Sequence, residues 1–175
     1  LRDLKRESAI LYDPGVQDWT ELFIYKIGEQ SNVSKKAFEL LIIEDNSLNA
    51  FAAPGGIIGV NAGLFKYSDN EAQFASVIAH ELAHLSQRHF ARQILEGSDR
   101  SNQSLATVLA SIVVAVATNS PAAIIGGQGL LVSQQLRFSR LYETEADREG
   151  YVTLQKSGYD TTQMSEMFKN MQEVR

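Results

Sequence analysis

Residues 79–84 read Ala-His-Glu-Leu-Ala-His, and this stretch contains the pattern H-E-x-x-H. On a helix, two residues four positions apart lie on the same side and one turn apart. The imidazoles of His80 and His84 can therefore reach a single metal ion. Glu81 lies beside them, where its carboxylate can reach a water on that ion without replacing it. The stretch predicts a helix that carries two zinc ligands and one general base.

The same pattern also fits a less specific alternative, in which two surface histidines lie on an amphipathic helix. The flanking residues favour a well-formed helix, because apolar side chains recur at spacings of three and four positions. These side chains are Phe74, Val77, Ile78, Leu82 and Leu85. We expect the helix to run from about Asn70 to Glu96, with Asp69 or Asn70 capping its start and Gly97 ending it.

A zinc peptidase site needs a third protein ligand, and His89 is the first candidate along the chain. On a continuous helix His89 would lie about 180° from His80, so it fails on geometry and fits the polar face better. The extended metzincin motif is also absent, since Gln87 and Phe90 stand where its glycine and third histidine would be. The chain has no cysteine, so we expect a carboxylate to supply the third ligand.

Composition narrows the class of protein. The chain has 175 residues, of which 44% are apolar and 21% are charged, as expected for one globular domain over residues 1–175. A net charge of −5 and the lack of a basic stripe argue against nucleic acid as a partner. The chain begins without an initiator Met or a signal peptide, so we expect a mature product or an excised piece. The absence of cysteine fits the bacterial periplasm, and it also fits many cytosolic proteins.

Two helices are expected before any strand. Residues 1–12 have the pattern of a short helix, and Asp13 and Pro14 then supply an N-cap and a first helical residue. The helix that follows is expected to end near Gly28. One of its faces carries a stripe that we interpret as core packing, formed by Val16, Trp19, Leu22, Phe23 and Ile27.

Three short strands are expected next, at residues 38–43, 49–53 and 57–60. A polar turn at 44–47 and the turn Pro54-Gly55-Gly56 separate them. We expect a small antiparallel sheet beside the zinc helix. An exposed edge of such a sheet can hold an extended peptide by main-chain hydrogen bonds. The alternative is a sheet that only covers the helix.

An uncharged region follows the expected zinc helix. No charged residue occurs between Arg100 and Arg137, and residues 105–117 are almost wholly apolar. This apolar run is too short for a transmembrane helix. We expect a helical hairpin over residues 105–130, which either is buried in the core, covers the cleft as a lid, or contacts a membrane or a partner.

The sequence from Arg137 onward offers several carboxylates as the third ligand. Five residues follow a 4-3-4 spacing and share one face that is otherwise small: Ser139, Glu143, Ala146, Asp147 and Gly150. Glu145 lies about 200° from Glu143. We therefore predict Glu143 as the metal ligand, and Asp147 as the residue that holds a ligating imidazole by its second nitrogen. The alternative is an acidic, solvent-facing helix with Glu145 and Glu149 exposed.

Three blocks, at residues 49–56, 80–84 and 139–147, together resemble one family of gluzincin metallopeptidases. This is the family of the CAAX prenyl endopeptidases and of the membrane heat-shock protease HtpX. Without clear membrane spans, the chain is most similar to the soluble periplasmic branch of β-barrel assembly-enhancing proteases. The family's E-x-x-x-D motif matches Glu143 and Asp147, in agreement with the argument from the helix face.

The resemblance implies a mostly helical α+β fold of the zincin type, with one Zn²⁺ held by His80, His84 and Glu143. It implies an endopeptidase that cleaves unfolded or misassembled proteins in outer-membrane quality control. It also implies a periplasmic location, protein or peptide substrates, and contact with a membrane surface or with the outer-membrane assembly machinery. Such relatives carry a helical-repeat domain after the protease domain. The natural protein is therefore expected to continue beyond Arg175, where a helix that begins near Thr161 ends.

The expected site predicts a mechanism. Glu81 takes the proton of a water that attacks a peptide carbonyl on zinc, and then gives it to the leaving amine. Arg140 is a candidate for a second oxyanion donor, or for a structural ion pair with Asp147. Two other functions stay open. One is a zinc-binding chaperone or scaffold with a blocked cleft, and the other is a zinc hydrolase that acts on something other than a peptide.

Overall fold

The computed structural model describes residues 13–34, 36–96 and 139–173. Within these ranges the chain forms a small sheet and several helices, so the expected mostly helical α+β fold is confirmed. The helix predicted for residues 1–12 and the hairpin predicted for residues 105–130 lie outside the described residues. None of the described helices is both long and apolar enough to cross a membrane.

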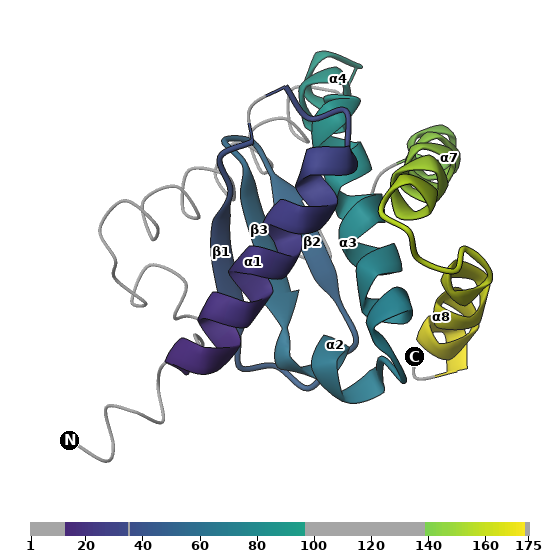
Figure 1. The fold of residues 1–175 in the computed structure, drawn as a ribbon. Helices are drawn as coiled ribbons and strands as arrows, with labels where there is room; N and C mark the ends of the chain where they lie inside the picture. The colour runs from purple at the N-terminus through teal and green to yellow at the C-terminus, as the bar shows by residue number, and fades with distance from the viewer. Residues whose placement is uncertain (1–12, 35, 97–138, 174–175) are drawn as a thin grey trace.

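The architecture is centred on helix α3 (Glu71–Ser86) (Figure 1). Strand β2 (Ala50–Ala53) runs along one side of α3, and α1 (Pro14–Gln30) crosses one face of the sheet. Helices α7 (Arg140–Lys156) and α8 (Thr162–Glu173) pack against α3 on the side away from the sheet. The predicted zinc helix is therefore enclosed between a sheet and two later helices.

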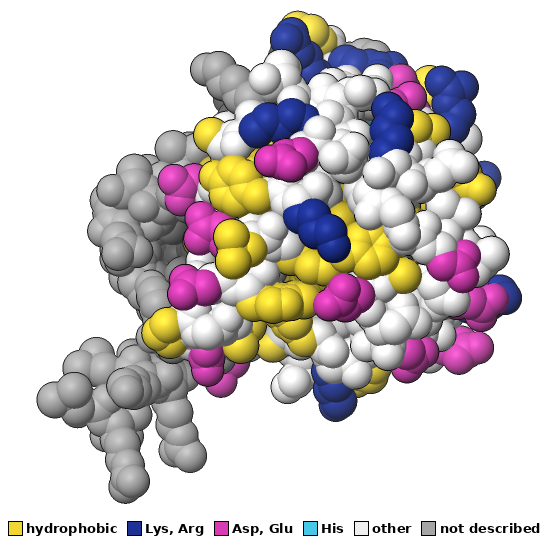
Figure 2. Space-filling model, viewed as in Figure 1, with side chains coloured by type: hydrophobic (Ala, Val, Ile, Leu, Met, Phe, Trp, Pro, Cys, Tyr) yellow, Lys and Arg dark blue, Asp and Glu magenta, His cyan; other side chains and the backbone are white. Residues whose placement is uncertain are grey.

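Helix α1 begins where the sequence indicates. The Asp13 carboxylate accepts a hydrogen bond from the Val16 N–H at 3.0 Å, and Pro14 is the first helical residue. The buried residues of the helix are Thr20, Phe23, Ile24, Ile27 and Gly28. The predicted core stripe was wrong for Trp19 and Leu22, which are 42% and 73% exposed. The buried face consists instead of the five residues named above, and Figure 2 shows a group of hydrophobic side chains at the surface beside α1.

The sheet has the strand order β1-β3-β2, with β1 at Glu39–Ile43 and β3 at Ile57–Asn61. Strands β2 and β3 form an antiparallel hairpin across the turn at residues 54–56. Strand β1 pairs with β3 in parallel, so the expectation of a wholly antiparallel sheet was wrong. Strand β3 lies between β1 and β2, and the chain reverses between β1 and β2 and again between β2 and β3, so β1 and β3 run in the same direction. Strand β2 is left as an edge strand next to α3.

The predicted single helix from Asn70 to Glu96 is interrupted. The Asn70 side chain caps α3 by accepting from the Gln73 N–H at 3.0 Å, as expected. Helix α3 ends at Ser86, and a separate helix α4 (His89–Glu96) follows. Between them Arg88 has a φ of 54°, in the left-handed region that few residues other than glycine adopt. A short helix α2 (Ala62–Tyr67), which the sequence did not predict, leads from β3 toward α3.

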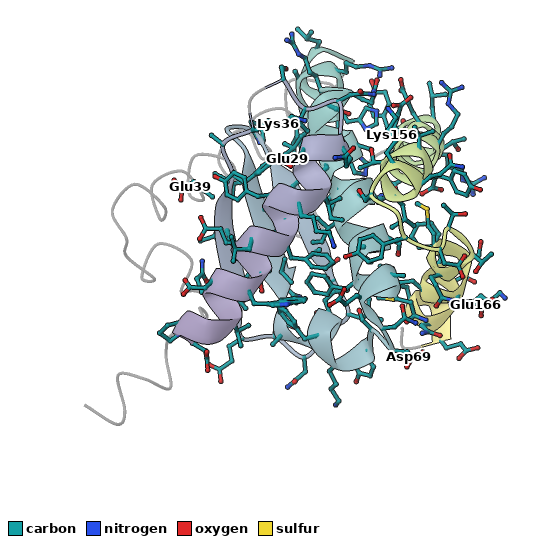
Figure 3. All side chains as sticks on the ribbon, viewed as in Figure 1. Glu29, Lys36, Glu39, Asp69, Lys156 and Glu166 are labelled. Atoms are coloured by element: carbon teal, nitrogen blue, oxygen red, sulfur yellow. The ribbon has the colours of Figure 1, made fainter. Side chains whose placement is uncertain are left out.

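Helices α3 and α7 approach each other closely through the small face predicted for α7. Ala146 is fully buried, and an ideal Cβ on Gly150 would lie 3.0 Å from the His80 Cα. Ser139 caps the start of α7 by accepting from the Tyr142 N–H at 3.4 Å. The charged side chains labelled in Figure 3 are all exposed and lie on the outside of the fold: Glu29, Lys36, Glu39, Asp69, Lys156 and Glu166.

Candidate metal centre

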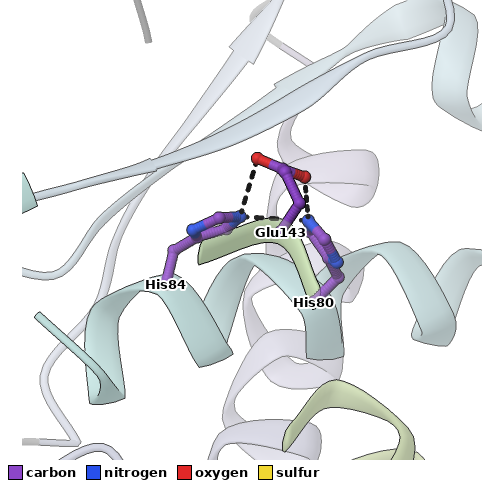
Figure 4. A group of neighbouring side chains, drawn as sticks. All are labelled: His80, His84 and Glu143. Atoms are coloured by element: carbon purple, nitrogen blue, oxygen red, sulfur yellow. Dashed lines mark hydrogen bonds and ion pairs between the residues drawn. The ribbon is translucent and has the colours of Figure 1, made fainter. Parts of the chain in front are cut away.

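Two histidines of α3 meet one glutamate of α7 (Figure 4). The Nε2 atoms of His80 and His84 are 3.0 Å apart. The Glu143 carboxylate oxygens lie 3.4 Å from His80 Nε2 and 3.8 Å from His84 Nε2. One donor atom from each residue thus lies within 4.8 Å of the other two. The structure brings together the three side chains that the sequence predicts as metal ligands.

The three donors fit a tetrahedral metal ion. A zinc ion with bonds of ~2.0–2.1 Å holds neighbouring ligand atoms roughly 3.3 Å apart. The separations of 3.0, 3.4 and 3.8 Å in this group bracket that value. His84 is almost fully buried, with 2% of its side chain exposed, whereas the Glu143 side chain is 46% exposed. The group can therefore bind an ion on its buried side and leave one coordination position open to solvent or substrate on its exposed side.

Asp147 lies one turn after Glu143 and contacts the other side of the His80 ring. Its Oδ1 is 2.9 Å from His80 Nδ1, which is the contact predicted for it. In the metal-free site, burial would lower the pKa of His80, but hydrogen bonds to Asp147 and Glu143 outweigh it and raise the pKa to about 10. His80 therefore holds a proton that an incoming metal ion has to displace.

Glu81 follows His80 in the sequence but directs its carboxylate toward the sheet. Its Oε2 accepts a hydrogen bond from the Ala52 N–H of β2 at 2.9 Å. Burial raises the pKa of Glu81 to about 7, and the nearby charge of His80 opposes this rise. A carboxyl group with such a pKa can accept and release a proton near neutral pH. The environment is compatible with the general base that the sequence predicts at this position.

The position of His89 differs from the sequence prediction. We expected it on the polar face of a continuous helix, but it is fully buried. Its Nδ1 lies 2.8 Å from the Nδ1 of His84, on the side of that ring away from the other two predicted ligands. The left-handed residue Arg88 ends α3 and turns the chain so that His89 folds back against the helix. Burial lowers the pKa of His89.

Glu145 also has partners that the sequence did not predict. Its Oε2 lies 3.3 Å from His89 Nε2 and accepts a hydrogen bond from Arg92 Nη1 at 2.8 Å. The hydrogen bond from Arg92, together with that from His89, lowers the pKa of Glu145. Glu145 is not among the three donors of the metal group. Its side chain is 31% exposed and has two partners, so it is not a freely solvated residue either. Arg140 is exposed, and no ion pair joins it to Asp147 within the described ranges.

A cleft of about 580 Å³ lies beside the metal group. His84 and Leu85 of α3 form one wall, and the turn at residues 54–56 forms another. The segment before β1 contributes Val33 and Ala37. The cleft therefore lies between the C-terminal end of α3 and the turn that follows β2, and of the metal group it touches His84.

This fold and this arrangement of donors define a metallopeptidase domain of the zincin type. The model of Peptidase family M48 matches residues 15–174. The chain therefore belongs to the M48 family of metallopeptidases, and the family expected from the sequence is confirmed. A metal cofactor follows from this membership.

Named relatives agree with this placement. The chain is 33% identical over 166 residues to the β-barrel assembly-enhancing protease of Escherichia coli (strain K12), a match that covers 94% of this chain and 34% of that protein. It is 31% identical over 174 residues to the Yersinia pestis protein of the same name, covering 98% and 36%. It is 30% identical over 162 residues to mitochondrial metalloendopeptidase OMA1 of Arabidopsis thaliana, covering 91% and 31%. The chain thus spans about a third of the length of these relatives.

Proposed function

We propose that the chain is a zinc-dependent endopeptidase domain that cleaves unfolded or misassembled proteins. The observation that carries the proposal is the group of donors from His80, His84 and Glu143, all within 4.8 Å of one another. Two imidazoles and one carboxylate in an open tetrahedral arrangement suit a catalytic Zn²⁺ ion, one per chain. When bound, zinc acts as a Lewis acid toward a water molecule and the substrate carbonyl.

Glu81 performs the proton transfers in this proposal. Its carboxylate takes the proton of the attacking water and later delivers it to the departing amine. The raised pKa of about 7 supports both steps, because such a group can both accept and release a proton near neutral pH. The hydrogen bond from the Ala52 N–H fixes one carboxylate oxygen and so orients the other. Asp147 keeps the His80 ring in the orientation that directs Nε2 to the metal.

The edge strand β2 supports a peptide as the substrate. The Asn49 carbonyl accepts from the Asn61 N–H of β3, so Ala50 and Ala52 direct their N–H and C=O groups away from β3. The Ala52 N–H already donates to Glu81, so a peptide would pair through the other outward groups of β2. An extended peptide added at this edge would lie beside Glu81. Main-chain pairing does not depend on the peptide's sequence, which favours unfolded chains over folded ones. The adjacent cleft of about 580 Å³ offers space for a substrate side chain.

The cellular setting is proposed from the relatives. Two of them carry the name β-barrel assembly-enhancing protease. Membrane β-barrels are outer-membrane proteins in bacteria. We therefore place the domain in the bacterial periplasm, in outer-membrane protein quality control, where it would contact the assembly machinery or the membrane surface. The net charge of −5 argues against nucleic acid as a further partner.

Metal content and cleavage of an unfolded protein test the proposal together. Zinc-loaded protein should contain one zinc per chain and cleave unfolded casein, but not a stably folded protein of similar size. Glu143→Ala should lose most of the zinc, whereas the control variant Glu149→Ala on the same helix, which lies outside the metal group, should retain it. Equal loss in both variants would contradict the role of Glu143. A zinc-loaded protein that binds unfolded chains without cleaving them would favour the alternative of a chaperone or scaffold.

A further inference from the structure

The buried ring of His84 has a partner on each of its two nitrogens. Its Nε2 faces the metal group, 3.0 Å from His80 Nε2 and 3.8 Å from Glu143 Oε1. Its Nδ1 faces the opposite way and lies 2.8 Å from the Nδ1 of His89. A separation of 2.8 Å between two ring nitrogens is a hydrogen-bond distance, so one nitrogen donates and the other accepts.

The direction of this hydrogen bond follows from the metal site. A His84 that binds a metal through Nε2 has no proton on that nitrogen, so its proton is on Nδ1. The Nδ1 of His89 must then accept, and the proton of His89 is on Nε2. That nitrogen lies 3.3 Å from Glu145 Oε2, which is an acceptor. Each step from the metal position to Glu145 thus has one consistent assignment of protons.

The surroundings of His89 hold its ring in place. The side chain is fully buried, and the ring stacks on Tyr142 of α7 with a centroid distance of 4.7 Å and an interplanar angle of 11°. Arg92 lies over the same Tyr142 ring, with its Cζ 4.5 Å from the centroid. Arg92 also donates to Glu145 Oε2 at 2.8 Å. The acceptor for His89 is therefore itself fixed by a charged partner on α4.

We propose that His89 is a positioning residue of the metal centre, which accepts the His84 Nδ1–H and is itself oriented by Glu145. The proposal rests on the proposed role of His84 as a metal ligand. In this arrangement the two histidine ligands are supported differently. A carboxylate, Asp147, holds His80 directly, whereas His84 is held through a second imidazole that leads to Glu145.

The residues that support the two histidine ligands come from different helices. Asp147 comes from α7, the helix that also supplies Glu143. His89 comes from α4 and connects to Glu145 of α7, so the support for His84 ties the short helix α4 to the metal centre. Correct placement of His84 therefore depends on how the chain turns at Arg88 and how α4 packs on α7.

Zinc affinity of two His89 variants tests the proposal. His89→Phe keeps a planar ring for stacking on Tyr142 but removes the acceptor. His89→Asn places an amide oxygen near the former Nδ1 and so keeps one. Loss of a hydrogen-bond partner of a metal-ligating histidine typically lowers metal affinity ~10–100-fold, which is the loss expected for His89→Phe. His89→Asn should recover most of that loss. The measurement is competition for Zn²⁺ against a chromophoric chelator, with thermal unfolding of the metal-free proteins alongside.

Nuclear magnetic resonance of the ¹⁵N-labelled imidazoles provides the second measurement, on the zinc-loaded wild-type protein. We expect an Nδ1–H on His84, an Nε2–H on His89, and a ¹⁵N–¹⁵N coupling between the two Nδ1 atoms across the hydrogen bond. A proton on His89 Nδ1 would overturn the proposal, and so would wild-type zinc affinity in His89→Phe. A third variant, His84→Ala, distinguishes failure of this proposal from failure of the proposed metal site. If His84 is not a metal ligand, His84→Ala retains zinc at wild-type affinity.

Discussion

Gly150 of α7 lies directly against the backbone of His80 on α3. An ideal Cβ on Gly150 would be 3.0 Å from the His80 Cα and 3.1 Å from its backbone nitrogen. The contact joins the helix that carries two predicted ligands to the helix that carries the third. Because the atoms in contact belong to the backbone, they cannot move aside by a side-chain rotation. The close approach of the two helices therefore depends on the absence of a side chain at position 150.

Gly150→Ala should consequently destabilise the protein and weaken metal binding. A methyl group in this contact forces the two helices apart, and overpacking of this kind costs about 1–3 kcal/mol. The gain in helix propensity from glycine to alanine is about 1 kcal/mol and offsets only part of that cost. Urea unfolding and zinc competition measure the two effects.

Gly15→Ala is the control for this variant. Gly15 is also helical, but an ideal Cβ at this position would meet only the Asp13 side chain, at 3.4 Å. This substitution should be neutral or slightly stabilising. If Gly150→Ala behaves in the same way, the helix contact does not limit the metal site.

Glu81→Gln should separate metal binding from cleavage. The amide cannot accept a proton, so cleavage of unfolded casein should fall by about 100- to 10,000-fold. Zinc content should stay near one per chain, because Glu81 is not among the three donors of the metal group. Metal analysis and a peptide-release assay on the same preparation provide the comparison. Retention of most of the activity would exclude Glu81 as the base.

Variants of Asp147 should affect zinc binding in a graded manner. Asp147→Ala removes the acceptor 2.9 Å from His80 Nδ1, and the zinc affinity should fall ~10–100-fold. Asp147→Asn keeps an oxygen that can accept the same N–H, so its loss should be clearly smaller. Chelator competition measures both. Wild-type affinity in Asp147→Ala would indicate that the contact with His80 has no role in metal binding.

Zinc affinity should increase with pH. In the metal-free site the pKa of His80 is raised to about 10, so at pH 7 the ring carries a proton that zinc must displace. Burial and the charge of His80 lower the pKa of His84, so that ring is already neutral and releases no proton. With one proton displaced, affinity should rise by about tenfold per pH unit between about pH 6 and 8. Chelator competition at several pH values tests this, and an affinity independent of pH would show that His80 is neutral before binding.

Much of the candidate site could be predicted from local spacing. His80 and His84 are four residues apart on one helix, as are Glu143 and Asp147 on another, and a helix places residues at this spacing on one face. The preference for Glu143 over Glu145 followed from the same periodicity, and the structure puts Glu143 with the histidines. The residues of the metal group are local properties of two helices, which is why periodicity finds them.

The sequence by itself determined the three strands, the start of α3 and the helix α7, and which side chains these two helices offer to a metal. Only the tertiary structure decided what lies behind those side chains. No glycine or proline marks the end of α3, so the left-handed Arg88 and the burial of His89 had no signal in the sequence. The parallel pairing of β1 with β3 could not be predicted from the sequence for a related reason. Alternation of apolar residues identifies a strand, but the neighbour of that strand depends on packing between segments distant in the chain.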